Sequence, residues 1–125
     1  MAKVAVVLSG CGFLDGAEVH ESVCALLNLS RNGAEVECFA PDAPQAHVVD
    51  HAKGQPAERE SRNVLAESAR ITRGNVKPLT GLHPESYDAL VMPGGFGVAK
   101  NLCDFAFSGA GMNIEPEIER VITGF

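Results

Sequence analysis

The sequence lacks any hydrophobic run near the ~20 residues that a transmembrane helix needs, so we expect no part of it to span a bilayer. It also lacks an excess of basic residues: 10 Lys and Arg stand against 16 Asp and Glu, for a formal net charge of −6. Proteins that bind nucleic acids neutralise phosphates with clustered basic side chains, so a nucleic-acid partner is disfavoured. No charged leader with an apolar core precedes the first strand-like run. We therefore expect a soluble, cytoplasmic protein.

The four cysteines form no Cys-x-x-Cys pair and show no spacing typical of a zinc site or a disulfide framework. With 46% apolar residues, the 125-residue chain can build the core of one domain without disulfides, so we expect reduced thiols. His20 and Cys24, four residues apart, could share a metal, but no second pair accompanies them. We therefore expect no metal and no cofactor.

Short apolar runs alternate with amphipathic segments along the chain. Residues 4–8 and 35–40 are typical of strands, the first buried on both faces as in a parallel sheet. Between them we expect a helix with Asp15 as N-cap, Glu18 closing a capping box, and Asn32-Gly33 ending it. Its predicted core stripe consists of Val19, Val23, Leu26 and Leu27.

The rest of the chain continues the pattern. Residues 47–51 predict a short edge strand or hairpin, and residues 87–92 a third buried strand. Three further helices are expected, and the first is capped by Ser61 and ends near Ile71. The second covers residues 97–107, with Val98, Leu102 and either Phe105 or Phe107 packing inward. The third covers residues 115–123, with Ile118, Val121 and Ile122 packing inward. This alternation predicts an α/β fold around a mostly parallel sheet.

In such a sheet ligands bind beyond the carboxyl ends of the strands, where two glycine-rich loops fall. Pro93-Gly94-Gly95-Phe96-Gly97 follows a buried strand, and its glycines let adjacent N–H groups point at one anionic oxygen, although a tight strand-to-helix turn is an equal reading. The loop from Gly10 to Gly16 fails the G-x-G-x-x-G pattern because Asp15 occupies the third glycine's place. A connection that caps the helix is therefore favoured over a phosphate cradle.

Several side chains near these loops are candidates for chemistry. Glu18, His20 and Glu21 lie in the first turns of the expected helix, where a carboxylate could act as a general base. Cys11 could be a reactive thiol, because a nearby helix N-terminus lowers a thiol pKa. The remaining cysteines, Cys24, Cys38 and Cys103, are interpreted as small core residues. The arginines at positions 59, 62, 70 and 73 are interpreted as a solvated face or an interface.

Taken together, a series of motifs resembles one family. The motifs are Val6-Val7-Leu8-Ser9-Gly10-Cys11-Gly12, Asp15-Gly16 with Glu18 and His20-Glu21, Phe39-Ala40-Pro41-Asp42, Arg62-Asn63-Val64-Leu65, Glu67-Ser68-Ala69-Arg70-Ile71 with Arg73-Gly74, and Pro93 to Gly97 through Ala99-Lys100-Asn101-Leu102. They closely resemble the ElbB family, the "enhancing lycopene biosynthesis" or sigma-cross-reacting proteins. That family lies in the PfpI and class I glutamine amidotransferase-like superfamily.

The resemblance implies a flavodoxin-like α/β sandwich with helices on both faces, commonly a homodimer. It also implies a reactive cysteine, a nearby glutamate and an oxyanion hole made by the Pro-Gly-Gly turn. Mapped onto this sequence, Gly94 and Gly95 are the oxyanion turn, and Glu21 is the better match for the glutamate, with Glu18 second. Gly10 and Cys11 complete the candidate substrate-binding residues.

The implied activity is a weak glyoxalase reaction that converts small dicarbonyls to hydroxy acids. The family's nucleophilic cysteine lies on an elbow beyond Phe125, and Gly124 resembles a glycine that launches a further strand. Residues 1–125 are accordingly expected to be the truncated N-terminal part of a single PfpI-type domain, inactive alone. The alternatives are a non-enzymatic anion-binding or regulatory module linked to isoprenoid metabolism, and a flavin or nucleotide binder at the Gly10–Gly16 loop.

Overall fold

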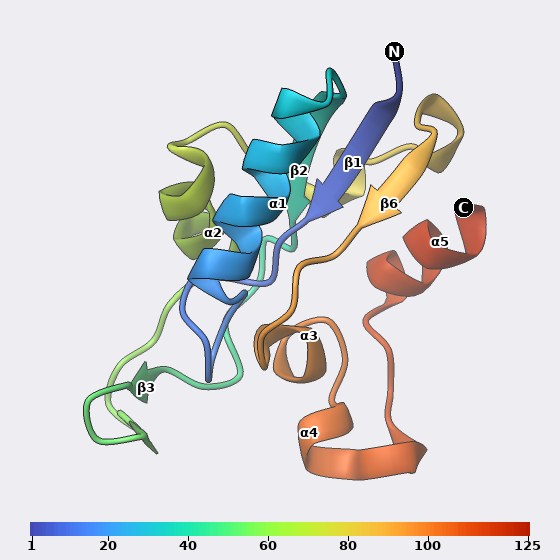
Figure 1. The fold of residues 1–125 in the computed structure, drawn as a ribbon. Helices are drawn as coiled ribbons and strands as arrows, with labels where there is room; N and C mark the ends of the chain where they lie inside the picture. The colour runs from blue at the N-terminus through green and yellow to red at the C-terminus, as the bar shows by residue number, and fades with distance from the viewer.

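In the computed structural model, which describes residues 1–125, four parallel strands form one sheet in the order β5–β2–β1–β6 (Figure 1). The strands are β1 Lys3–Val7, β2 Glu35–Ala40, β5 Lys77–Pro78 and β6 Ala89–Val91. In the central register, Val6 of β1 pairs with Cys38 on one side and Val91 on the other. β5 was not predicted, since two residues carry no periodic signal.

The side chains of β1 alternate between two hydrophobic cores, as expected for a strand buried on both faces. Ala5 and Val7 face one core, which contains Phe39, Leu79, Leu82, Leu102, Ile118 and Val121. Val4, Val6 and Leu8 face the other core. The prediction of a strand buried on both faces at residues 4–8 is thus confirmed, with β1 itself ending at Val7.

Helices cover both faces of the sheet (Figure 1). Helices α1 (Val19–Arg31) and α2 (Val64–Thr72) cover one face, where Leu26, Leu29 and Ile71 pack against the core. Helix α5 (Pro116–Gly124) covers the other face through Ile118 and Val121. The short helices α3 (Gly97–Lys100) and α4 (Phe105–Ser108) lie beyond the carboxyl end of β6. The predicted α/β class is therefore confirmed.

Of the two structures predicted for residues 47–51, a short edge strand or a hairpin, the structure shows the hairpin: β3 (Val49–Asp50) pairs antiparallel with β4 (Gln55–Pro56), apart from the main sheet. Single 3₁₀ turns complete the chain at Leu79–Gly81, Pro84–Ser86 and Gly109–Gly111. The longest helix, α1, has 13 residues, and no helix is both long and apolar enough to cross a bilayer.

The predicted helix caps were wrong in two places. Glu18, not Asp15, caps α1, because its carboxylate accepts a hydrogen bond of 2.7 Å from the N–H of Glu21. Asp15 is buried and accepts a bond of 2.8 Å from the N–H of Val49 in the hairpin. Asn63, not Ser61, caps α2 through a bond of 3.0 Å from the N–H of Ala66.

The predicted core stripe of α1 was partly wrong, because it mixed two faces of the helix. The buried side is marked by Ser22, Leu26 and Leu29, which keep the three- and four-residue spacing of one face. Val23 and Leu27 lie about one residue further around the helix and are 47% and 51% exposed. Cys24, expected in the core, is exposed.

The helix predicted over residues 97–107 is broken into α3 and α4. Lys100 is the last residue of α3, and the side-chain amide of Asn101 bonds the backbone carbonyls of Ser9 and Asp15. Leu102 is buried as predicted, but Phe105 and Phe107 are exposed. Likewise α5 buries Ile118 and Val121 while Ile122 stays exposed.

Candidate active site at the β1–β6 crevice

The side of β1 on which successive strands are added to the sheet changes between β5 and β6. From β1 the chain moves outward to β2 and β5, and then returns to form β6 on the other side of β1. In open α/β sheets, ligands bind in the crevice at this reversal, outside the carboxyl ends of the strands. The two predicted glycine-rich loops follow β1 and β6, so the topology brings them together there (Figure 1).

Main-chain hydrogen bonds hold the two loops against each other. The N–H of Glu18 donates to Gly94 O at 2.8 Å, and the N–H of Gly97 donates to Gly16 O at 3.0 Å. Gly95 adopts a φ of +111°, and a Cβ there would overlap the backbone of Gly16 and Glu18. Glycine is required at this position both by the backbone conformation and by the close approach of the other loop.

The turn after β6 presents two unpaired donors. Neither the N–H of Gly94 nor that of Gly95 donates to an acceptor within the protein. The strand before the turn was predicted to be buried, but β6 is half-buried because it lies at the edge of the sheet. Adjacent backbone N–H groups at the end of this strand suit a developing oxyanion. Both interpretations of Pro93–Gly97 thus fit the geometry, because the segment is a tight turn and also offers two free donors.

Glu21 reaches this turn from the first turn of α1. Its carboxylate packs directly against Gly94, and a Cβ on Gly94 would overlap Glu21 Oε2. The carboxylate makes no hydrogen bond or ion pair with another side chain, while the N–H of Glu21 is taken by the cap. Glu21 therefore has a free carboxylate beside the two free N–H groups.

Glu18 is engaged elsewhere. Its carboxylate accepts from the N–H of Glu21 and contacts Nδ1 of His20 at 2.9 Å. Hydrogen bonds to the Glu18 carboxylate lower its pKa below the usual range. The bond from the N–H of Glu21 makes the largest contribution, and the bond from His20 makes the next largest. Of the two predicted glutamates, the structure brings Glu21 to the glycine turn and uses Glu18 as a helix cap.

Gly10 and Cys11 face α2 rather than the glycine turn. The N–H of Gly10 donates to Ser68 Oγ at 3.0 Å, so it is not available to a ligand. Burial makes the largest contribution in raising the pKa of the Cys11 thiol, and the negative charge of Glu67 makes the next largest. The expected lowering of the Cys11 pKa was therefore wrong, because burial and the nearby carboxylate of Glu67 both disfavour the thiolate.

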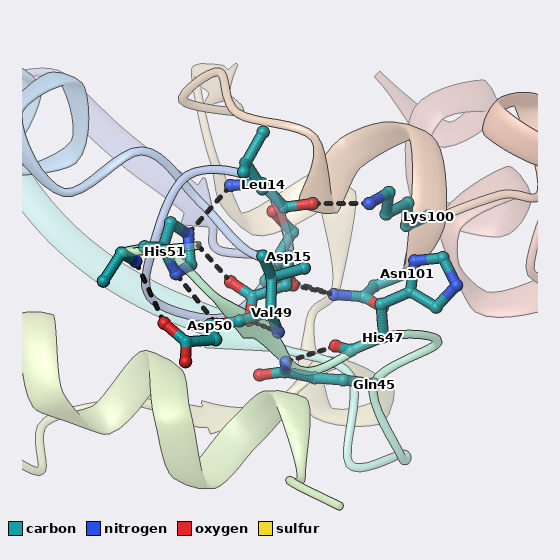
Figure 2. A network of polar contacts seen from close by, with 11 residues as sticks. Leu14, Asp15, Gln45, His47, Val49, Asp50, His51, Lys100 and Asn101 are labelled. Atoms are coloured by element: carbon teal, nitrogen blue, oxygen red, sulfur yellow. Dashed lines mark hydrogen bonds and ion pairs between the residues drawn. The ribbon is translucent and has the colours of Figure 1, made fainter. Parts of the chain in front are cut away.

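A polar network beneath the first loop was missed by sequence reasoning (Figure 2). Asp15 accepts from Val49, the Asn101 amide donates to Asp15 O at 3.1 Å, and Lys100 Nζ donates to Leu14 O at 2.7 Å. These partners are 34 to 86 residues apart in the sequence, so local patterns cannot reveal them. The only available signal was the position of Lys100 and Asn101 within the family-like motif after the glycine turn.

The predicted metal candidates, His20 and Cys24, gain no third ligand. His20 is exposed and pairs with Glu18, and Cys24 is exposed on the same helix. No group of three or more His, Cys, Asp or Glu side chains is placed to hold a metal ion. All four cysteines are free thiols.

The chain has close relatives among curated proteins. It is 57% identical over 124 residues to the "ES1 protein homolog, mitochondrial" of Rattus norvegicus, covering 99% of this chain and 47% of that protein. It is also 57% identical over 124 residues to the human "Glutamine amidotransferase-like class 1 domain-containing protein 3, mitochondrial", covering 99% and 46%. The "ES1 protein, mitochondrial" of Danio rerio is 41% identical over 127 residues, covering 98% and 47%.

A solved structure matches the fold over the whole chain. The crystal structure of an isoprenoid biosynthesis protein with an amidotransferase-like domain from Ehrlichia chaffeensis superposes with a TM-score of 0.92 at 42% identity. The match covers 100% of this chain and 56% of that one. No protein-family model matches the chain.

Together these similarities support the class 1 glutamine amidotransferase-like superfamily and an amidotransferase-like, flavodoxin-like fold. The chain spans about half the length of the curated relatives it matches. All three relatives are named mitochondrial proteins, which overturns the expectation of a cytoplasmic protein.

Proposed function

We propose that this amidotransferase-like chain carries the glutamate and the oxyanion turn of an ElbB-like protein. In the complete protein they would serve a cysteine-dependent, glyoxalase-like reaction that converts a 2-oxoaldehyde and water to a 2-hydroxy acid. The observation that supports the proposal is the free carboxylate of Glu21 packed against Gly94, beside the unpaired N–H groups of Gly94 and Gly95. By similarity to its relatives, we propose a mitochondrial location for the protein.

The proposed chemistry needs no external oxidant or reductant. A cysteine thiolate adds to the aldehyde carbon, and the resulting alkoxide accepts hydrogen bonds from Gly94 and Gly95. Glu21 takes the proton from that carbon and returns it to the neighbouring one, which turns the adduct into a thioester of the hydroxy acid. Water then cleaves the thioester, releasing the product and the thiol. One carbon is oxidised and its neighbour reduced, and one water is consumed.

None of the four cysteines makes a hydrogen bond to Glu21, Gly94 or Gly95. Cys11 lies against α2, Cys24 is exposed, and burial raises the pKa of Cys38 to about 11. Cys103 donates to Val98 O at 3.4 Å. We therefore propose that residues 1–125 form the N-terminal part of a single PfpI-type domain, whose nucleophile lies in sequence that follows.

A chimera tests this proposal. The 125 residues replace the corresponding part of the Ehrlichia chaffeensis protein, with which they share 42% identity and the whole fold. We expect the chimera to convert methylglyoxal to lactate and the 125-residue chain alone to show no turnover. Glu21→Gln should lower kcat by at least ~100-fold, since it removes the proton-transferring group. The exposed Glu119→Gln is the matched control.

Two results would overturn the enzymatic proposal. One is robust turnover by the isolated chain, which would place the nucleophile among its own cysteines. The other is full activity of the Glu21→Gln chimera.

A second candidate function is a non-enzymatic anion-binding or regulatory module. It is favoured by the same two free N–H groups, which can bind an anion whether or not a thiol is present. This candidate predicts that glyoxylate shifts the amide signals of Gly94 and Gly95 and that alkylating all thiols leaves the binding unchanged. A chimera with measurable, Glu21-dependent turnover would decide against it.

A further inference from the structure

Two aromatic side chains stand exposed at the mouth of the β1–β6 crevice. Phe13 belongs to the loop after β1 and Phe96 to the turn after β6, and they are 47% and 46% exposed. Their ring centroids lie 5.6 Å apart with an interplanar angle of 65°, an edge-to-face arrangement. Paired apolar rings left in solvent beside a candidate site are more informative than single exposed apolar residues, because they mark recognition surfaces.

The rings are held in place by the backbone. The N–H of Phe96 donates to Phe13 O at 2.9 Å, so the two residues that carry the rings are bonded directly to each other. Lys100 adds a second tie, since its Nζ donates to Leu14 O and lies 5.8 Å from the Phe96 ring centroid. The backbone positions of both residues are therefore fixed before a ligand binds, which reduces the conformational entropy lost on binding.

The pocket lined by the aromatic pair lies next to the oxyanion turn. Phe13, Gly95, Phe96, Val98 and Ala99 line a pocket of about 300 Å³. Gly95 is common to this pocket and to the pair of free N–H groups. A group attached to a carbonyl bound at Gly94 and Gly95 therefore has this pocket as its neighbour. No titratable side chain lines the pocket, which suits an uncharged, flat, apolar group.

We propose that Phe13 and Phe96 form a specificity subsite for the non-reacting group of the substrate, and that this group is aromatic. The preferred ligands are then aryl-substituted 2-oxo compounds rather than glyoxal or glyoxylate. This inference rests on the proposed function, because it takes the Gly94–Gly95 turn as the place where the oxo or carboxylate oxygen binds. The aromatic group of the ligand binds through stacking and edge-to-face contacts with the two phenylalanine rings.

Binding to the ¹⁵N-labelled 125-residue chain tests the inference with two stable carboxylates, glyoxylate and phenylglyoxylate. We expect both to shift the Gly94 and Gly95 amide signals, and phenylglyoxylate to bind roughly tenfold more tightly. Phe96→Ala and Phe13→Ala should each reduce that preference while leaving glyoxylate affinity unchanged. Phe105→Ala is the matched control, since Phe105 is similarly exposed but does not line the pocket.

The outcomes separate this inference from the proposed function. Equal affinity for the two ligands, or a preference that survives both variants, overturns the aromatic subsite while leaving the anion site intact. No shift at Gly94 and Gly95 with either ligand overturns both. A change in sedimentation of Phe13→Ala or Phe96→Ala without a change in ligand preference would assign the rings to contact between copies of the chain and overturn the subsite.

Discussion

Nε2 of His51 lies 3.6 Å from Oδ1 of Asp15, a carboxylate that is only 5% exposed and whose Oδ1 has no hydrogen-bond partner (Figure 2). The same ring nitrogen accepts the N–H of Leu14 at 3.1 Å, and Nδ1 donates to Val49 O at 3.0 Å. Both contacts are satisfied by one neutral tautomer, with the proton on Nδ1. The ring thus links the β3–β4 hairpin to the loop that supports the oxyanion turn.

Replacing His51 should loosen this loop. His51→Ala removes the acceptor of the Leu14 N–H and a donor to Val49 O, and we expect unfolding to become easier by ~1–2 kcal/mol. Urea denaturation measures the loss, and amide exchange should show faster exchange at Leu14. His83→Ala is the control, because His83 is exposed and has only a distant contact with Glu85. Equal losses in the two variants would show that His51 does not support the loop.

The two glycines of the oxyanion turn should respond differently to alanine. At Gly95 the new Cβ meets backbone atoms of Gly16 and Glu18 at a φ of +111°, so Gly95→Ala should cost at least ~2 kcal/mol. At Gly94 the three atoms nearest to the Cβ all belong to the flexible end of Glu21, so Gly94→Ala should fold but displace that carboxylate.

Chemical denaturation and the shifts of the Glu21 signals distinguish these two effects. Gly111→Ala serves as the reference, since a Cβ there meets nothing within 4 Å. A Gly95→Ala variant as stable as Gly111→Ala would contradict the close approach of the two loops.

Acid should weaken the fold through Glu37. Lys77, Lys3 and Tyr87 bond its carboxylate, and Lys77 makes the largest contribution in lowering the pKa of Glu37 from 4.5 to about 2. A carboxyl whose folded pKa is depressed contributes stability above pH 4.5 and loses it as the pH falls toward 2. The difference in unfolding free energy between wild type and Glu37→Gln should therefore shrink over this interval. A difference that stays constant from pH 6 to pH 2 would count against the network.

Tyr87 should limit stability at the alkaline end. Burial and then the bond to Glu37 raise the pKa of Tyr87 from 10 to about 12. A phenol that stays neutral in the folded state contributes stability below pH 10 and loses it between pH 10 and 12. Tyr87→Phe should remove that part of the alkaline dependence, as measured by urea unfolding at pH 8 to 11.5. An unchanged alkaline profile in Tyr87→Phe would refute the assignment.

Thiol alkylation should follow exposure and pKa. Cys24 is exposed, burial raises the pKa of Cys11, and burial raises the pKa of Cys38 to about 11. Iodoacetamide at pH 8 should therefore label Cys24 first and Cys38 last, as read by peptide mass spectrometry. In urea all four thiols should react at similar rates. Rapid labelling of Cys11 in the native protein would indicate an activated thiol.

The elements that the sequence predicts well are those whose signal is local. The β-branched run at residues 4–8 is buried on both faces, and the glycine pair at 94 and 95 forms the predicted turn. The role of Glu21 remains a prediction, and the structure shows only that its carboxylate packs against Gly94.

Two of the predictions failed because a distant partner decides the outcome. Asp15 has the spacing of a helix cap, yet Val49 takes its carboxylate, and the cap moves to Glu18. The helix predicted over 97–107 stops at Lys100, with the Asn101 side chain bonded to the carbonyls of Ser9 and Asp15. Each competing contact joins residues more than 30 positions apart, so no local window contains it.

Three of the bonds that join the two loops of the crevice connect main-chain atoms: Glu18 to Gly94, Gly97 to Gly16, and Phe96 to Phe13. Side-chain substitution at Glu21, Phe13 or Phe96 leaves every one of these bonds available. The spacing between the loops is thus independent of what the site carries. A designer could therefore exchange the acid or the aromatic rings for other functional groups and retain the same pair of amide donors, which makes this crevice a suitable host for installing new chemistries.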